Sequence, residues 1–382
     1  MNPADSLARL RLARTEGIGP QTFRRLLAQH GSAERALRAL AADPARRFTP
    51  PDPGTVEGEH DAILGMGGEW LHLGGPGYPP LLAALDDAPP VLAALGDLSL
   101  LPRRQVAIVG SRNASSAGRR IAEDMAEALA EAGVAVTSGL ARGIDAAAHA
   151  GALRHGRTIA VIPGGLDIAY PPENRSLQEA IAAEGLLLAE APLGTAPLAR
   201  HFPKRNRIVA GLCLGIVVIE AAHRSGTLIT ARLGAEAGRE IYAVPGSPLD
   251  PRCQGSNDLL RNGARFCEHA GDVLETLPAT AEALPLFAPS PSRGGARPRM
   301  HVPAPPHAEP GESGDSELLS LIGPTPVAVD EVLRRCHLSP PNARAALLEL
   351  ELEGLIEALP GNRVVRSGAQ RAEGLEGGQP TA

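Results

Sequence analysis

The chain has little lysine, few aromatic residues and no long apolar run. Lys204 is the only lysine among 37 basic residues, and five Phe, three Tyr and one Trp are the only aromatic side chains in 382 residues. The formal net charge is −6, which excludes a uniformly basic coat for nucleic acid. Any DNA or RNA site must therefore be a local concentration of positive charge, with few aromatic platforms for bases.

Cysteine pairs and targeting segments are also missing. Four cysteines, Cys213, Cys253, Cys267 and Cys336, form neither a zinc-type pair nor a disulfide framework. The N-terminus has no apolar signal core, and the longest apolar stretch, 212–222, is shorter than the roughly 20 residues that span a bilayer. We therefore expect a soluble, cytoplasmic protein without a membrane span, a metal or a cofactor. His149 and His155 are expected to be ordinary helix residues.

Composition predicts the domain organisation. Residues 1–65 form a helical domain whose first 47 residues carry nine arginines against four acids, and the Gly- and Pro-rich stretch 48–103 suggests loops. Strand and helix patterns alternate up to residue 284. Residues 285–314 are a Pro/Gly-rich linker, because this composition cannot pack a core. A compact piece follows at 315–368, and 369–382 is a flexible tail.

The central region predicts an α/β fold with a doubly wound parallel sheet. Six apolar runs have strand character, and helix-competent segments separate most of them, which is typical of parallel sheets covered on both faces. These runs are 105–109, 134–138, 158–162, 186–190, 214–219 and 241–244. Such sheets bind ligands beyond the carboxyl ends of their strands.

The loops at those carboxyl ends all contain glycine, so the backbone and helix N-termini can approach an anion. The first of them, Gly110-Ser111-Arg112, is neither a dinucleotide fingerprint nor a Walker A loop, because Arg112 replaces the second glycine and no Gly-Lys-Ser/Thr follows. Asp145 is interpreted as a carboxylate at a helix start. Tight turns alone would also require some of these glycines.

The flanking regions suggest two small modules. Residues 15–20 predict a helix-hairpin-helix turn, with Arg14, Arg24 and Arg25 as nearby charge, although a plain interaction module has the same pattern. The C-terminal piece predicts a winged helix from helical runs at 315–322, 328–336 and 341–353 and a following hairpin. Its recognition helix is acidic, with Glu349, Glu351 and Glu353, so contact with protein is favoured over DNA.

The long central motifs resemble one family. They are VAIVGSR (106–112), TSGLARGIDAAAHAGAL (137–153), TIAVIPGGLDIAYPPEN (158–174), HFPKRNRIVAG (201–211), SGTLITARLGAEAGREIYAVPGS (225–247) and GSNDLLRNGA (255–264). In this order they resemble the DNA-processing protein A family, DprA or Smf. The resemblance implies an extended Rossmann-like domain between a SAM-like helical domain and a winged helix. It also implies a non-enzymatic protein that binds and protects single-stranded DNA and loads the RecA recombinase in natural transformation.

The resemblance and the loop positions together predict a DNA-binding set. Arginine meets phosphate in bidentate geometry, an aromatic ring stacks on any base, and a helix start offers backbone N–H groups. The predicted residues are Gly110, Ser111, Arg112, Gly139, Arg142, Arg175, Phe202, Lys204, Arg205, Asn206, Arg207, Ser225, Gly226 and Thr227. Family members often carry a lysine where this chain has Pro172, and Arg175 is the nearest substitute. A homodimer contact is expected at Leu259 and Leu260.

Two other classes of function are considered. Phosphoribohydrolases of the cytokinin-activating type have a similar sheet and carry P-G-G-x-G-T-x-x-E, but here Thr230 stands in place of the Glu and the double glycine is absent. Glu220 and Glu236 are the alternative carboxylates of such a hydrolase. A transcription regulator acting through the winged helix is disfavoured by the acidic recognition helix.

Overall fold

The computed structural model describes residues 2–42, 48–223 and 225–278, together with parts of the C-terminal region between 321 and 366. The chain forms two compact units, 1–302 and 303–382. The expected linker at 285–314, the tail at 369–382 and the three recognition-helix glutamates lie outside the described residues. In the part that is described, no helix is long and apolar enough to cross a membrane.

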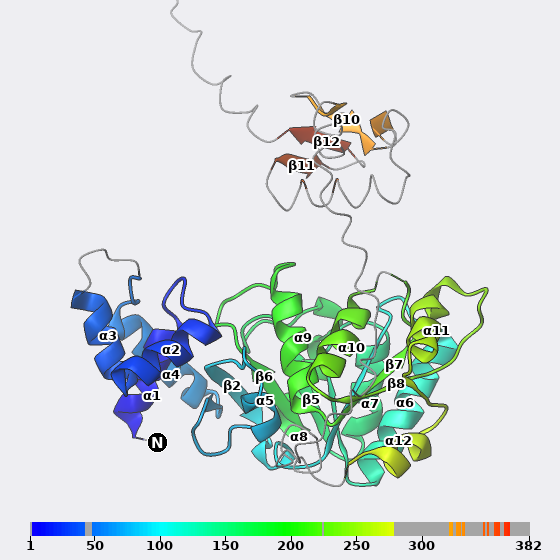
Figure 1. Cartoon of the computed structure of the whole chain (residues 1–382), viewed down its shortest axis with the longest axis horizontal. Helices are drawn as coiled ribbons and strands as arrows, with labels where there is room; N and C mark the ends of the chain where they lie inside the picture. Colours follow the sequence, from blue (N-terminus) through cyan, green and yellow to red (C-terminus); the bar gives the residue numbers. More distant parts are fainter. Residues whose placement is uncertain are drawn as a thin grey trace, which may run out of the picture. The chain divides into compact units, whose positions relative to one another are not determined.

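Four helices precede the sheet, and the first three form a small core of their own (Figure 1). They are α1 (Pro3–Ala13), α2 (Pro20–His30), α3 (Ala33–Ala42) and α4 (Pro53–Gly65). Proline at the first turn and side-chain caps from Asn2 and Asp52 fix where α1 and α4 begin. Leu12, Phe23 and Leu37 are buried between them. The turn predicted at 15–20 joins α1 to α2, and its last residue, Pro20, is the first residue of α2.

A nine-stranded sheet forms the centre of the first unit, in the order β1-β2-β6-β5-β4-β3-β7-β8-β9. The strands are β1 (Glu69–His72), β2 (Val91–Gly96), β3 (Gln105–Gly110), β4 (Ala135–Ser138), β5 (Thr158–Ile162), β6 (Leu186–Ala189), β7 (Gly215–Ile219), β8 (Glu240–Ala243) and β9 (Arg265–Phe266). All pairs from β6 to β9 are parallel. The six predicted strands and the doubly wound fold class are therefore confirmed.

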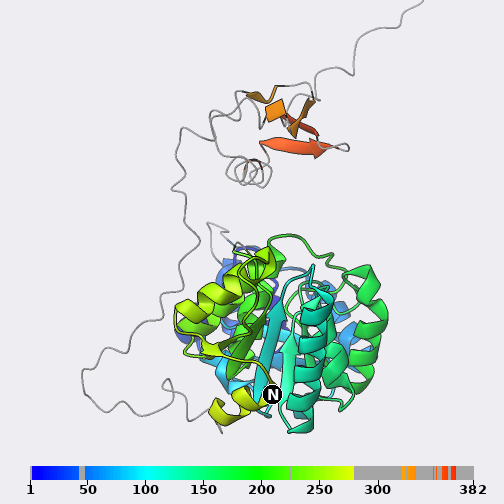
Figure 2. The same ribbon diagram turned by 90° about the vertical axis from the view of Figure 1, so that its right-hand side faces the viewer.

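Helices cover both faces of the sheet, as the view in Figure 2 shows. The helices after α4 are α5 (Pro80–Ala83), α6 (Ser116–Glu131), α7 (Ile144–Leu153), α8 (Arg175–Glu184), α9 (His201–Leu212), α10 (Gly226–Glu236), α11 (Gln254–Arg261) and α12 (Ala270–Thr276). Residues of α9, α10 and α11 share one apolar cluster with alternate strand residues, and α6, α7 and α12 share another. The alternation follows from the two-residue period of strand side chains.

The expectation of loops over 48–103 was wrong. This stretch contains α4, β1, α5 and β2, and β2 joins the sheet antiparallel to β6 while β1 pairs with β2. The short apolar run from Val91 to Leu95 is buried on both faces apart from its last residue, so it has no polar alternation to reveal a strand. Glycine and proline around it gave the loop-like composition.

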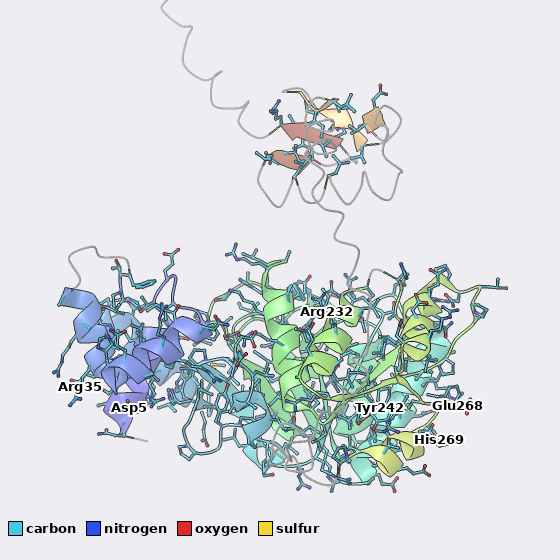
Figure 3. All side chains as sticks on the ribbon, in the orientation of Figure 1. Asp5, Arg35, Arg232, Tyr242, Glu268 and His269 are labelled. Atoms are coloured by element: carbon cyan, nitrogen blue, oxygen red, sulfur yellow. The ribbon has the colours of Figure 1, made fainter. Side chains whose placement is uncertain are left out.

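The far edge of the sheet is closed by α11, β9 and α12. Tyr242 on β8 is fully buried, and its hydroxyl lies 2.8 Å from Thr276 Oγ1 of α12. Figure 3 labels Tyr242 beside the exposed chain at Glu268 and His269, where His269 and Asp272 form the N-terminal capping box of α12. Reciprocal capping of this kind fixes where a helix starts. The docking of α12 thus combines apolar packing with the Tyr242–Thr276 hydrogen bond and the cap.

The second unit has a three-stranded antiparallel sheet in the order β10-β12-β11. The strands are β10 (Val327–Ala328), β11 (Ile356–Leu359) and β12 (Arg363–Arg366). Ile322, Val332, Leu347, Ile356 and Val364 form its core. The predicted C-terminal hairpin is therefore confirmed.

His149 of α7 supports the loop after β4 from within the core. The ring is fully buried, with Nδ1 2.7 Å from Thr158 Oγ1 of β5 and Nε2 accepting from the Leu140 N–H. Leu140 holds a left-handed backbone, φ 55°, which a non-glycine residue adopts at some cost. Burial lowers the pKa of His149 to about 3, so the imidazole is neutral at pH 7.

We expect His149→Gln to flatten the acid side of the stability profile. His149 binds a proton below about pH 6.5 in the unfolded chain but only below about pH 3 in the folded chain. The free energy of unfolding therefore falls as the pH falls between these values. The slope that one such proton contributes is at most about 1.4 kcal/mol per pH unit. Urea unfolding at pH 6.5 and 5.0 measures it, with exposed His155→Gln as the matched control. An unchanged slope in His149→Gln would contradict the assignment.

Candidate nucleic-acid interface

The strand order reverses between β3 and β7, so the loops that follow these strands diverge to opposite sides at their carboxyl ends. Such a switch point is where open α/β sheets bind ligands. Gly110 ends β3 here, and a Cβ at this position would lie 1.9 Å from the Ile219 carbonyl oxygen and 2.5 Å from the Ile144 side chain. Glycine is therefore required by the packing of β3 against β7. Close packing alone explains this residue, without any contact to a ligand.

The start of α10 is tied to the end of β3. Ser225 Oγ accepts from the Thr227 N–H at 3.2 Å and donates to Thr227 Oγ1, which in turn donates to the Gly110 carbonyl at 2.9 Å. The predicted Ser225, Gly226 and Thr227 therefore lie at the switch point, beside the loop that carries Arg112. Gly226 is exposed at the first turn. The positive end of the α10 dipole is thus open to an anion.

Arg112, Phe202 and Tyr170 come together from two loops and the first turn of α9. The Arg112 guanidinium lies 4.8 Å from the centroid of the Phe202 ring, within cation–π range. The Tyr170 ring meets Phe202 at a centroid distance of 5.8 Å and an angle of 65°, the edge-to-face geometry that aromatic pairs prefer. Arg112 is exposed and Tyr170 is 37% exposed. This cluster presents a cation and two aromatic rings at the surface.

Arg205, one of the predicted phosphate ligands, is buried instead. It is 6% exposed, and its Nη1 lies 4.0 Å from Asp145 Oδ2. A Cβ on Gly139 would lie 1.4 Å from that Nη1, so Gly139 provides the space that the guanidinium fills. Burial raises the pKa of Asp145 and lowers that of Arg205, and each partner's charge opposes the change in the other. Arg205 and Gly139 therefore support the loop after β4.

Asp145 completes this support. Its Oδ2 accepts from the N–H groups of Gly139 and Ala141, at 3.2 and 3.3 Å, which fixes the turn before α7. The interpretation of Asp145 as a helix-start carboxylate holds for its position in the first turn. The sequence did not predict its ion pair with Arg205, because the two residues are 60 positions apart in the chain.

The prediction that Arg207 faces DNA was wrong. Arg207 is 8% exposed, its Nη2 donates to both carboxylate oxygens of Glu190 at 2.6 and 2.7 Å, and Nη1 donates to the Asp87 carbonyl. Its charge is neutralised inside the protein, where it joins α9 to the loop before β2 and to the end of β6. A guanidinium held in this way is not available to a phosphate.

Among the remaining predicted residues, Arg142, Arg175 and Lys204 are exposed, and Ser111 and Asn206 are half-buried. Arg142 pairs with Glu173 at 3.3 Å, with both side chains more than half exposed. Ser111 Oγ accepts from the Asn113 N–H, and its carbonyl accepts from the Ile144 N–H. Of the predicted cations, Arg112, Arg142, Arg175 and Lys204 are thus at the surface.

Arg14 and Arg24, expected near DNA, instead join the N-terminal helices to the sheet. Arg14 pairs with Glu59 at 2.7 Å and donates to the Glu190 carbonyl at 2.9 Å. Arg24 donates to the carbonyls of Ala83 and Leu85. Arg25 is exposed. Most of the predicted charge around the helix-hairpin-helix turn is therefore internal.

Glu220, one of the two alternative carboxylates of the hydrolase interpretation, is not free to act on a ligand. Glu220 is 8% exposed and accepts from both the N–H and the hydroxyl of Ser115, so it caps the start of α6. A Cβ on Gly118 would lie 2.6 Å from its carboxyl carbon. Thr230, at the hydrolases' Glu position, is 3% exposed. In the described part of the chain, no three His, Cys, Asp or Glu side chains gather as a metal site would require.

Profiles of three domains match the chain in order. A DprA-like N-terminal HHH domain matches residues 3–62, the DNA recombination-mediator protein A profile matches 69–278, and a DprA winged helix domain matches 302–362. The second of these covers more than half of the chain. The chain belongs to the DNA recombination-mediator protein A family.

Named relatives and solved structures agree with the family. Protein Smf of Synechocystis sp. is 38% identical over 76% of this chain and 78% of its own length. The X-ray structure of DprA from Streptococcus pneumoniae has a TM-score of 0.63 and 33% identity over 73% of this chain and 99% of that one. A structure of DprA from Helicobacter pylori, described for its single-stranded DNA binding mode, has a TM-score of 0.51 and 29% identity, covering 55% and 95%.

The spacing of motifs does not single out Tyr170 in this family member. Its loop, AYPPEN, belongs to one of the long family motifs, which as a whole assigns no separate role to this side chain. The available signal is an aromatic residue in a carboxyl-end loop of a chain with so few aromatics. The structure adds Tyr170 to the cluster with Arg112 and Phe202.

The dimer prediction also needs a correction. Leu259 is 2% exposed and packs in the main core cluster, so it cannot reach a second copy without unpacking. Leu260 is half-buried and packs against the same cluster from the outside.

We expect Arg207→Ala to destabilise the fold by roughly 2–4 kcal/mol, because it leaves Glu190 without its partner in a partly buried site. The matched control Arg142→Ala removes an exposed pair and should cost less than about 1 kcal/mol. Urea unfolding at pH 7 compares the two. Equal losses would show that Arg207 is not the internal tie that its contacts indicate.

Proposed function

We propose that this chain binds single-stranded DNA at the carboxyl ends of β3, β5 and β7, without catalysing a reaction. The observation that carries the proposal is the cluster of Arg112, Phe202 and Tyr170, which combines a phosphate-binding cation with aromatic rings at a sheet's switch point. Single strands are bound by this combination because every base has a π-face. Family membership supports the proposal, as does the likeness to the Helicobacter pylori DprA with its single-stranded DNA binding mode.

The binding set follows from the contacts. Arg112, Lys204, Arg142 and Arg175 contact phosphates, Phe202 and Tyr170 stack on bases, and the N-terminus of α10 at Ser225, Gly226 and Thr227 holds a further phosphate. Gly110, Gly139 and Arg205 act from behind this surface, through the loop positions that they fix. Asn206 follows Lys204 and Arg205 in α9. Pro172 supplies no charge where family members often have lysine.

The cellular role rests on the family. We propose that the chain acts in the cytoplasm, protects incoming single strands in natural transformation and transfers them to the RecA recombinase. We also propose a homodimer in which Leu260, at the sheet edge formed by α11 and β9, contributes to the contact. Light scattering that shows a monomer independent of concentration would contradict the dimer.

We expect Arg112→Ala and Lys204→Ala to reduce the salt dependence of single-strand binding. Removing one phosphate-binding cation lowers the slope of log affinity against log salt by roughly 0.7. The matched control is Arg103→Ala, because Arg103 is exposed and precedes the N-terminal end of β3, away from the carboxyl ends of the strands. Labelled oligonucleotides, single- and double-stranded, are titrated across a salt series. Tighter binding of duplex, or a slope in Arg112→Ala equal to that of the parent, would contradict the proposal.

We expect Phe202→Ala to weaken binding by about 1–3 kcal/mol while leaving the salt slope unchanged, because stacking displaces no counterion. Since Arg112 lies on the Phe202 ring, the two substitutions should be coupled by at least about 0.5 kcal/mol. Phe266→Ala, which removes a 54% exposed ring from β9, is the matched control. A double-mutant cycle in the same titration measures the coupling, and strict additivity would show that the two side chains act separately.

A further inference from the structure

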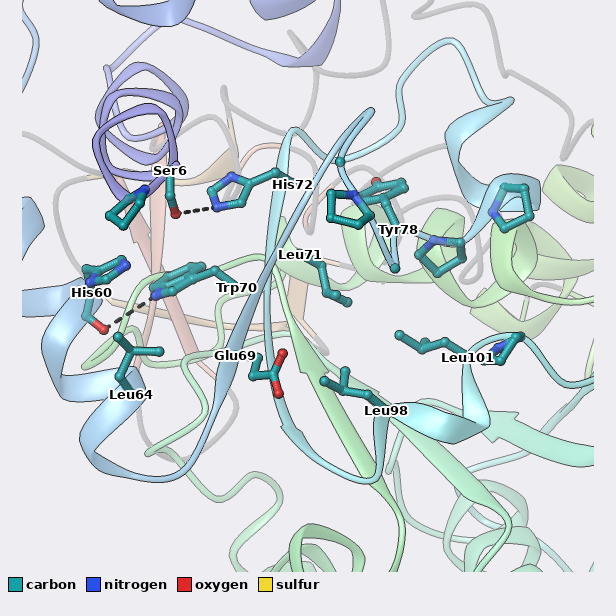
Figure 4. A pocket seen from close by; sticks show the side chains of 17 residues that line it. Ser6, His60, Leu64, Glu69, Trp70, Leu71, His72, Tyr78, Leu98 and Leu101 are labelled. Atoms are coloured by element: carbon teal, nitrogen blue, oxygen red, sulfur yellow. Dashed lines mark hydrogen bonds between the residues drawn. The ribbon is translucent and has the colours of Figure 1, made fainter. Parts of the chain in front are cut away.

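A groove of about 790 Å³ runs along β1, the strand at the opposite end of the sheet from β9. Its volume is within the range of specific binding pockets. The lining is mostly apolar, as the close view in Figure 4 shows. Its larger side chains are Leu64, Trp70, Leu71, Tyr78, Leu98 and Leu101. The groove shares no residue with the DNA site proposed above.

Backbone groups of β1 face the open side of the sheet. Leu73 N–H donates to the Pro90 carbonyl at 2.9 Å, which fixes the phase of the antiparallel ladder between β1 and β2. Because bonding directions alternate along an antiparallel strand, Glu69 and Leu71 bond to β2, and the N–H and C=O of Trp70 and His72 point outward. The His72 carbonyl accepts from Gly75. The Trp70 N–H, the Trp70 C=O and the His72 N–H bond to no residue that the structure describes.

The walls of the groove alternate along the same strand. Glu69 and Leu71 lie on one side of β1 with Leu98 and Leu101, and Trp70 and His72 lie on the other with Leu64 (Figure 4). His60 stacks on Trp70 at a centroid distance of 6.4 Å and completes that wall. An extended peptide points its side chains to alternate sides, so it would place apolar groups on both walls while its backbone pairs with β1.

The charge of the groove favours a basic partner. Glu69 is exposed and is the one carboxylate in the lining, and no cation among the described residues pairs with it. His72 is 5% exposed, with Nε2 2.7 Å from Ser6 Oγ and Nδ1 unpartnered. Burial lowers the pKa of His72 to about 4, so at pH 7 the ring adds no positive charge. The lining is therefore apolar with a single negative charge.

We propose that the open edge of β1 binds an extended peptide segment of a partner protein as an added strand. The segment has apolar side chains at alternate positions and a basic side chain opposite Glu69. Main-chain hydrogen bonds supply affinity in this mode of recognition, and the alternating pockets supply specificity. The inference does not depend on DNA binding.

The test starts with a phage-displayed library of random 12-residue peptides, selected on the full chain without DNA. Trp70 is the only tryptophan, so its emission reports binding of each enriched synthetic peptide directly. We expect enriched peptides with alternating apolar residues and one basic residue. Two versions of each peptide are compared, one N-methylated at the odd residues and one at the even residues. Only one of the two should bind at least tenfold more weakly, because N–H groups at every second residue of an added strand face β1.

Two exposed positions in the groove serve as variants. Leu64→Asp and Glu69→Lys should each weaken peptide binding at least tenfold. Leu198→Asp is the matched control, because Leu198 and Leu64 are both 47% exposed and Leu198 lies outside the groove. Circular dichroism verifies that the variants are folded.

Three outcomes would overturn the proposal. The first is that no selected peptide depends on both Leu64 and Glu69. The second is binding that is insensitive to N-methylation in both versions of the peptide, which would indicate an apolar pocket rather than strand addition. The third is that Glu69→Lys changes the oligomeric state and that Trp70 emission of the parent depends on protein concentration. This result would assign the β1 edge to contact between copies of the chain.

Discussion

The close approach of Gly110 to the Ile219 carbonyl is the constraint on which the proposed DNA site depends. It sits where the strand order reverses, and no side chain fits there. Because β3 and β7 approach so closely, the loop of Arg112 and the start of α10 lie side by side, joined by the Thr227 hydroxyl. Neither loop would have this position if the two strands were spread apart. The packing of Gly110 thus places the residues that are proposed to bind DNA.

Buried guanidinium groups are the second determinant of the structure. Arg205, Arg207 and Arg239 are each less than 10% exposed, and Arg239 donates to the carbonyls of Leu81, Ala210 and Gly211. A guanidinium has five donors that suit carbonyls and carboxylates as well as phosphates. A cluster such as Lys204, Arg205 and Arg207 therefore does not reveal, from sequence alone, which member faces solvent. The position of each residue around helix α9 decides whether its side chain faces solvent or the interior.

The predictability of the fold followed the strength of each local pattern. The six central strands are continuous apolar runs flanked by helical segments, and all were predicted. β1 and β2 were missed because Gly and Pro surround them, although the pairing of β2 with β6 and of β1 with β2 makes them strands. In the site, Arg112 and Phe202 were predicted from position and resemblance. Their contact with each other, and with Tyr170, depends on loop conformations that no spacing encodes.

The β1 edge and the proposed DNA site are separated in the sheet and are linked through one residue outside both, Glu190. Four strands, β2, β6, β5 and β4, lie between β1 and β3, so at about 4.8 Å per strand the two sites are roughly 24 Å apart. Ligands of ordinary size could therefore occupy both at once. Glu190, just after β6, joins the elements that form them. The Glu190 carbonyl accepts from Arg14, which directly follows α1, and Ser6 of α1 lines the groove. The Glu190 carboxylate accepts from Arg207 of α9, the helix that also carries Phe202 and Lys204. Glu190 thus connects the elements of the two proposed sites, through its backbone on one side and its carboxylate on the other.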